Sequence, residues 1–161
     1  MIKVIDNFLP KYQFDQLQSI VMSDEFAWYY NEGVAYEGDG FYQFIHFFYN
    51  DKPSPRPTRT FKCIESSLSP FKIKKIYRIK SNLQTGTVFH RKSAYHIDDL
   101  PCSATAILYM NTCNGWTEFK KGGKVKSVAN RVVIFDPTLK HRGVTCTDEK
   151  RRVVINFNYD V

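Results

Sequence analysis

The sequence predicts a mostly β protein with supporting helices, in which a double-stranded β-helix, or jelly roll, forms the core. Short strand-like segments separated by turn residues follow one another from about residue 72 to the end, which is typical of two facing antiparallel sheets. Helical periodicity is confined to the first 71 residues, and two helices are too few to cover both faces of a parallel sheet. We therefore expect one domain over 1–161, with 1–71 as helical and strand support and 72–161 as the core.

The N-terminal segment is expected to begin with a strand over 2–5 and a helix over about 11–22, which opens after Pro10. Aromatic-rich segments at 26–30 and 41–49 favour strands. The helix carries an apolar stripe at helical spacing, which predicts that one of its faces is buried. The residues of this stripe are Phe14, Leu17, Ile20 and Val21.

A second helix is expected between Thr58, which can cap its first turn, and Ser69-Pro70, which ends it. The preceding residues 50–57 contain three prolines and read as a loop. We expect both N-terminal helices to pack on the larger sheet of the core. The apolar face of the second helix would consist of Phe61, Ile64 and Leu68.

The strands of the core follow from alternating patterns between turn signals such as Asn114-Gly115 and Asp136-Pro137. In a roll of two sheets, the second and the seventh strand of such a series are neighbours. The strands are expected at about 72–82, 87–97, 103–111, 116–119, 124–127, 131–135, 141–145 and 152–159.

Two histidines and one aspartate form a candidate metal site. His96 and Asp98 are two residues apart at the end of the second core strand, so strand geometry points both side chains to one face. His141 opens the seventh strand, next to the second. Two imidazoles and one carboxylate with open positions opposite suit a non-haem Fe(II) site. A His-x-Asp pair alone is a weak pointer, because such motifs occur by chance.

Composition narrows the function classes. Formal net charge is +7, which fits an acidic partner such as nucleic acid but fits a solvated surface better. The four cysteines show no Cys-x-x-Cys spacing, so we expect free thiols in a reducing, cytoplasmic setting. The sequence has neither a signal-peptide pattern nor an apolar run of membrane-spanning length. We expect no membrane association and no obligate protein partner.

Several short motifs occur in one order along the C-terminal half of the chain. Together they resemble the Fe(II)- and 2-oxoglutarate-dependent dioxygenases, close to the prolyl-4-hydroxylase-like branch that includes short phage and bacterial proteins. Each motif alone is weak, and it is their shared order that carries the resemblance. The motifs are His96-Ile97-Asp98, Ile107 to Asn111, Gly115 to Phe119, Asn130 to Asp136, His141, and Arg152 to Asn156.

The resemblance implies a set of roles. His96, Asp98 and His141 would hold Fe(II), and 2-oxoglutarate and dioxygen would be co-substrates. An arginine would bind the far carboxylate of 2-oxoglutarate, since its planar fork matches both oxygens. Arg152 is the choice, because its strand face also carries a polar Asn156, and the adjacent Arg151 would point away.

Two further residues have weaker claims to the co-substrate. Asn82, at the end of the first core strand, stands where the family has a polar residue that contacts 2-oxoglutarate, and it could equally begin a turn. Tyr109 could contact the co-substrate as well, or be plain core.

The expected function is therefore hydroxylation of an unactivated C–H bond, with release of succinate and carbon dioxide. A prolyl or other side chain of a peptide or protein is the first expectation for the substrate. Because Asp98 is present, the related halogenation chemistry is disfavoured. The alternatives are oxidation or dealkylation of a nucleic-acid base, and a cupin-like metal-binding protein without turnover. If binding of 2-oxoglutarate requires Arg152, the chain is an enzyme rather than a cupin-like metal-binding protein, because a metal site without turnover needs no such cation.

Overall fold

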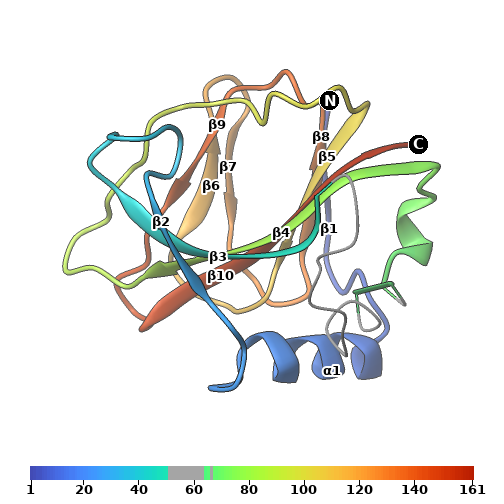
Figure 1. The fold of residues 1–161 in the computed structure, drawn as a ribbon, viewed down its shortest axis with the longest axis horizontal. Coiled ribbons are helices and arrows are strands. Elements are labelled where there is room, and N and C mark those ends of the chain that lie inside the picture. The colour runs from blue at the N-terminus through green and yellow to red at the C-terminus, as the bar shows by residue number, and fades with distance from the viewer. Residues whose placement is uncertain (51–63, 66) are drawn as a thin grey trace.

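Two antiparallel sheets form the centre of the structure, a computed structural model that describes residues 1–50, 64–65 and 67–161 (Figure 1). The large sheet contains, in order across it, β1 (Ile2–Ile5), β8 (Val132–Phe135), β5 (Ala104–Tyr109), β10 (Arg151–Asp160), β4 (Lys75–Thr85), β3 (Tyr42–Asn50) and β2 (Tyr29–Glu32). The small sheet contains β7 (Gly123–Lys126), β6 (Trp116–Phe119) and β9 (His141–Val144). A helix, α1 (Lys11–Val21), and a short 3₁₀ turn, η1 (Ser69–Phe71), complete the elements.

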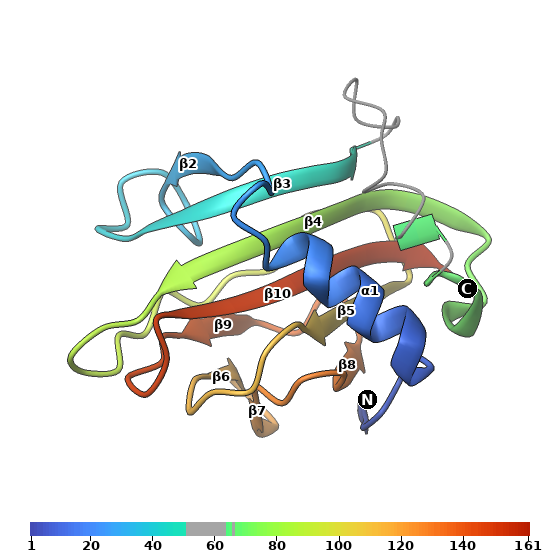
Figure 2. The same cartoon turned by 90° about the horizontal axis from the view of Figure 1, so that it is seen from below.

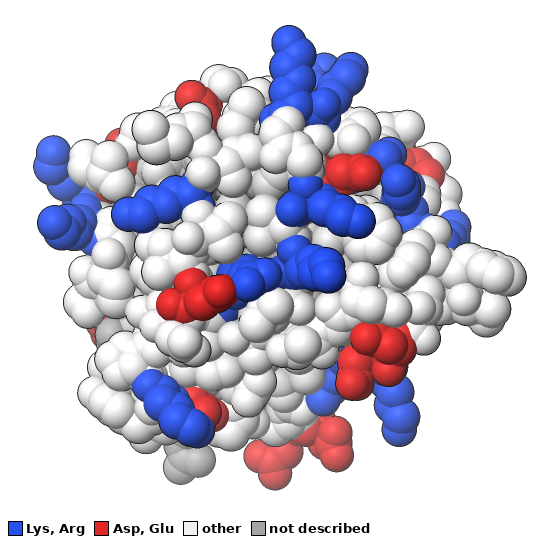
Figure 3. All heavy atoms as spheres, turned by 180° about the vertical axis from the view of Figure 1, so that it is seen from behind, with Lys and Arg blue, Asp and Glu red and all other residues white. Residues whose placement is uncertain are grey.

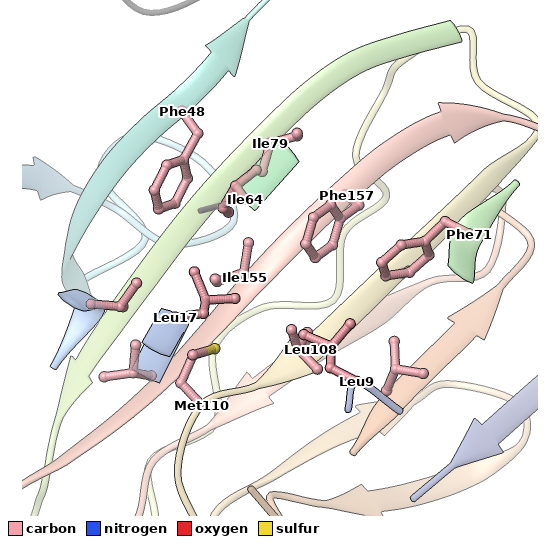
Figure 4. Packing of buried hydrophobic residues seen from close by; sticks show 14 of the residues in the cluster. Leu9, Leu17, Phe48, Ile64, Phe71, Ile79, Leu108, Met110, Ile155 and Phe157 are labelled. Atoms are coloured by element: carbon pink, nitrogen blue, oxygen red, sulfur yellow. The ribbon is translucent and has the colours of Figure 1, made fainter. Parts of the chain in front are cut away.

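The outer face of the large sheet is covered by α1, which lies across β4, β10 and β5 (Figure 2). The helix buries Phe14, Leu17 and Val21, as its apolar stripe predicts. These side chains belong to one apolar cluster with Ile79 of β4 and Ile155 of β10, part of which Figure 4 shows. Burial of this stripe, rather than helix propensity, is what holds so short a helix in place.

The inner face of the large sheet packs against the small sheet. Alternate residues of the central strands supply this second apolar cluster, because successive side chains of a strand point to opposite faces. Tyr109 and Val154 face inward, whereas Leu108 and Ile155 face α1. The small sheet contributes Phe119. The chain is thus mostly β, with the two facing sheets of a jelly-roll-like fold.

One expected strand is wrong: residues 87–97 form no regular strand. They meet β9 at isolated antiparallel bridges, one of which joins His96 to His141. Side-chain hydrogen bonds compete with the ladder in this segment. The Thr87 hydroxyl, for example, donates to the carbonyl oxygen of Phe89 at 2.7 Å. The other predicted strands and the first helix match described elements to within a few residues.

The expected second helix lies largely outside the described residues. Ile64 and Glu65 are helical, and Ile64 is buried in the cluster beneath α1. Among the described thiols, Cys102, Cys113 and Cys146 are free, as expected, and Cys63 lies outside the described part. Within the described ranges, no helix is both long and apolar enough to cross a membrane.

Asn130 fastens the start of α1 to the large sheet. Its side-chain oxygen accepts a hydrogen bond from the Leu9 N–H at 2.9 Å, and its amide group donates to the Leu9 carbonyl at 2.8 Å. Both bonds are buried, and Asn130 has a positive φ of 60°. We expect Asn130→Ala to lower the free energy of unfolding by about 2–4 kcal/mol, since a net hydrogen bond contributes about 1 kcal/mol and an orphaned buried group costs about 1–3. Chemical denaturation monitored by circular dichroism measures this loss.

Asn7 supplies the matched control. It is exposed and also has a positive φ, of 50°. Asn7→Ala therefore carries the backbone strain of an alanine in this region, about 1–2 kcal/mol, without losing the buried hydrogen bonds. Equal losses in the two variants would contradict a special role for the Asn130 side chain.

Candidate metal centre

The three predicted metal ligands lie together. One ligand atom from each of His96, Asp98 and His141 falls within 4.8 Å of the other two. The backbone sets part of this geometry, because His96 and His141 face each other across an antiparallel bridge, with both N–H to carbonyl distances at 3.0 Å. Asp98 follows two residues after His96, and the next residue, Asp99, has a positive φ of 47° and is exposed.

Hydrogen bonds orient both imidazoles for metal binding. The Nδ1 of His141 lies 3.1 Å from the carbonyl oxygen of Leu139, and the Nδ1 of His96 lies 3.4 Å from that of Ala94. A carbonyl oxygen only accepts, so each Nδ1 carries the proton and each Nε2 keeps a lone pair free for a metal. Burial, together with the neighbouring His141, lowers the pKa of His96. The neutral form, which is the ligand form, is thereby favoured.

Asp98 is held from the side of the large sheet. One oxygen forms an ion pair with Arg78, whose Nη2 lies 2.8 Å away, and the other accepts a hydrogen bond from Asn158 Nδ2 at 2.9 Å. Burial alone would raise the pKa of Asp98, but Arg78, His141, the Asn158 hydrogen bond and His96 together lower it. The carboxylate is therefore ionised at neutral pH and fixed in orientation, as a ligating carboxylate requires.

Arg152 lines the same cavity as the three candidate metal ligands. Its guanidinium is buried and donates to Ser127 Oγ at 2.8 Å, to Thr117 Oγ1 at 3.0 Å and to Gln84 Oε1 at 3.3 Å. Among the described residues it has no acidic partner. A buried guanidinium bonded to neutral oxygens alone is well placed to receive an anion.

The backbone packs closely against the Arg152 side chain at a glycine, Gly115. A Cβ built on Gly115 would lie 2.8 Å from Cδ of Arg152 and 2.8 Å from the carbonyl oxygen of Val144. Any larger residue at Gly115 would displace either the arginine side chain or the backbone of β9. Arg151 takes the opposite direction, as alternation predicts, and its Nη2 donates to the carbonyl of Met22 at 2.7 Å, just beyond α1.

Asn82 also faces the cavity. Its side-chain oxygen is buried, and no hydrogen-bond partner exists for it within the described ranges; the same is true of Asn156 on β10. Because the two ends of an amide have the same shape, a half-turn would place N–H donors where these oxygens lie. The guanidinium carbon of Arg152 lies over the Tyr109 ring, 5.6 Å from the ring centre. The Tyr109 hydroxyl donates to Thr117 Oγ1 at 2.8 Å.

Sequence reasoning missed several residues that line the cavity, among them Lys80, Gln84 and Thr117. A signal for two of them was present, since Lys80, Asn82 and Gln84 occupy alternate positions of β4 and therefore share a face. His90 is exposed and packs edge-on against Trp116, with 4.7 Å between the ring centres. The cavity is narrow, with a volume of about 50 Å³.

No protein-family model matches the sequence, and neither does any curated protein sequence. Solved structures do match the fold over nearly the whole chain. A prolyl hydroxylase from Trichoplax adhaerens, in complex with a peptide fragment of the hypoxia inducible factor oxygen degradation domain, matches with a TM-score of 0.63 at 16% identity, covering 98% of this chain and 82% of that chain. A prolyl-4-hydroxylase from Pseudomonas putida matches with a TM-score of 0.67 at 13% identity, covering 99% of this chain and 92% of that chain.

A different activity occurs among the similar structures. The non-heme alpha ketoglutarate dependent epimerase SnoN from nogalamycin biosynthesis matches with a TM-score of 0.67 at 10% identity, covering 98% of this chain and 77% of that chain. The shared architecture is therefore compatible with more than one reaction outcome. The chain has the fold of the iron- and 2-oxoglutarate-dependent oxygenases, prolyl hydroxylases among them.

Proposed function

We propose that this chain is an Fe(II)- and 2-oxoglutarate-dependent dioxygenase that hydroxylates a C–H bond in a side chain of a peptide or protein, with a prolyl residue as the first candidate. One observation carries the proposal: two oriented imidazoles and an ionised carboxylate share a cavity with a buried arginine that has no acidic partner among the described residues. A passive metal site has no use for such a cation, whereas a dicarboxylate co-substrate needs one.

The donor set fits iron. His96, Asp98 and His141 would supply two nitrogens and one oxygen on one side of the ion, the arrangement that leaves positions open in non-haem Fe(II) oxygenases. Bound there, iron would supply the activation of dioxygen. The overall reaction balances, because one oxygen atom of O₂ enters the succinate formed from 2-oxoglutarate and the other becomes the hydroxyl group of the product, with carbon dioxide released.

The chain's own residues would position the co-substrate. Arg152 would bind the far carboxylate through two parallel N–H donors, and Asn82, with its amide turned, would add a donor beside it. The present cavity has room for only about four waters, at ~10–15 Å³ each. We therefore expect the carboxylate to replace Thr117 and Gln84 as partners of Arg152, with those side chains turning aside.

Two considerations favour a peptide substrate. The prolyl hydroxylase from Trichoplax adhaerens was solved with a peptide bound, and the similarity covers 98% of the present chain. By contrast, the face seen in Figure 3 shows Lys and Arg side chains spread among acidic ones, without the continuous cationic track that a nucleic-acid backbone favours.

Metal removal provides the test of the proposed function. Protein loaded with Fe(II) in air is expected to convert 2-oxoglutarate to succinate slowly, and faster when a hydroxylatable peptide is present. EDTA should stop succinate formation, and added Fe(II), but not Zn(II), should restore it. Succinate and remaining 2-oxoglutarate are measured by NMR. Failure of the Mn(II)-loaded protein to bind 2-oxoglutarate in calorimetry would overturn the proposal.

A further inference from the structure

Lys80 is a cation in the candidate site to which neither the fold nor the proposed chemistry gives a role. It lies in the middle of β4, on the strand face that also carries Asn82, and it lines the cavity. Its neighbours across the sheet are Phe47 on β3 and Asn156 on β10. Lys80 therefore lines the same cavity as the candidate metal ligands and lies next to β3 in the sheet.

The ammonium group of Lys80 has no ion-pair partner in the part of the chain that the structure describes. Asp98 is the one acidic residue among the described residues that line the cavity. Its oxygens are already taken by Arg78 and Asn158. Lys80 instead has its ammonium group 5.9 Å from the ring centre of Phe47, a contact that does little to offset its charge.

The surroundings make this charge costly. Burial lowers the pKa of Lys80 to about 8, and the neighbouring Arg78 contributes to the shift, although Asp98 opposes it. A divalent metal at His96 and His141 would add two further positive charges nearby. An ammonium group kept in such a place is stabilised when an anion binds next to it.

The co-substrate already has partners for both of its carboxylates. In the proposed function one carboxylate goes to Arg152 and the other to the metal. Arg152 lies opposite Gln84 on β4, four residues from Lys80, so the backbone positions of Gln84 and Lys80 are about 13 Å apart at ~3.3 Å per residue. With both carboxylates of the co-substrate already assigned, Lys80, set apart from Arg152 along the strand, calls for a third anionic group.

We propose that Lys80 binds an acidic side chain of the peptide substrate, next to the residue that is oxidised, so that the site selects acidic peptides. The inference rests on the proposed function and names its substrate class. An Asp or Glu carboxylate would accept a charge-assisted hydrogen bond from the Lys80 ammonium group. Val34, from the connection before β3, also lines the cavity and would contact the apolar part of the same peptide.

A peptide selection tests this without knowledge of the natural substrate. Protein loaded with Mn(II) and N-oxalylglycine, a 2-oxoglutarate analogue that is not decarboxylated, is immobilised and exposed to random heptapeptides. The peptides are acetylated and amidated, so that only Asp and Glu carry carboxylates. Retained peptides are sequenced, and the Kd of an enriched peptide is compared with that of its Asn or Gln counterpart. Wild type, Lys80→Met and Lys80→Arg are run side by side, after circular dichroism and thermal melting have shown that each is folded.

The expected result is enrichment of Asp or Glu at one position by wild type and by Lys80→Arg, but not by Lys80→Met. The acidic peptide should bind wild type at least about tenfold more tightly than its amide counterpart, since a hydrogen bond to a charged group is worth that much. Identical profiles for wild type and Lys80→Met, including retention of no peptide by either, would overturn the inference.

Binding of 2-oxoglutarate to the three Mn(II)-loaded proteins separates the remaining outcomes. Unchanged affinity in Lys80→Met is expected. A loss of affinity in that variant would assign Lys80 to the co-substrate and overturn its role in peptide selection. If wild type itself does not bind 2-oxoglutarate, the proposed function fails, whatever the peptide profiles show.

Discussion

Replacing His96 with alanine is expected to abolish tight metal binding and, with it, the conversion of 2-oxoglutarate to succinate. The variant removes one of the three donors that lie within 4.8 Å of each other. Loss of a partner that only orients a ligand already costs about 10–100-fold in metal affinity, so loss of the ligand itself should cost more than ~100-fold. Calorimetry with Mn(II) under anaerobic conditions measures the affinity, and NMR measures the succinate.

His90 offers a matched control for this variant. It is exposed, and its ring contacts Trp116 and the carbonyl of Thr145 rather than the candidate metal ligands. His90→Ala should keep wild-type metal affinity and turnover. Wild-type Mn(II) affinity in His96→Ala would show that the metal, if bound, sits elsewhere.

Replacing Arg152 with methionine is expected to weaken binding of 2-oxoglutarate by about 10–100-fold, because a hydrogen bond to a charged group contributes about 1.5–3 kcal/mol. The free energy of unfolding should change little, because exchanging a buried cation for an apolar chain of similar length offsets the hydrogen bonds that are lost. Thr117 and Gln84 line the cavity and can turn toward solvent there, whereas the buried Ser127 loses the donor of its 2.8 Å bond. Calorimetry on the Mn(II)-loaded protein gives the affinity, and urea denaturation gives the stability.

Arg151 is the natural comparison, because it is adjacent in sequence and points to the opposite face of β10. Arg151→Met removes the hydrogen bond to the carbonyl of Met22. It should lower stability modestly and leave 2-oxoglutarate affinity unchanged. Should both variants bind 2-oxoglutarate as wild type does, the assignment of the co-substrate carboxylate to Arg152 is wrong.

Strand alternation made much of the site accessible to sequence reasoning. A period of two assigns Arg152 to the cavity and Arg151 to the side of α1, and the structure has them so. The same period places Tyr109 and Val154 between the sheets. The face on which a strand residue lies can be assigned from sequence alone, because a shift of one residue would turn every apolar side chain of the strand away from the core.

Other features depend on contacts that a one-dimensional pattern does not carry. The segment 87–97 has the residue types of a strand, yet the Thr87 hydroxyl bonds locally, and only isolated bridges to β9 form. The roles of Arg78 and Asn158 follow from their meeting Asp98, which is far from both in sequence. Lys80 was visible as a polar residue at an alternate position, but the lack of a counterion among the described residues emerges only in three dimensions.

The pairing of His96 with His141 has a consequence for solubility. In the small sheet, β9 is an edge strand, and such an edge offers unpaired amide groups to any other extended chain. The segment that carries His96 lies along this edge and pairs with it at two points, Lys92–Val144 and His96–His141. The segment that carries the candidate metal ligand His96 thus also covers the edge of the small sheet. Substitutions that detach this segment from β9 should therefore cause aggregation first.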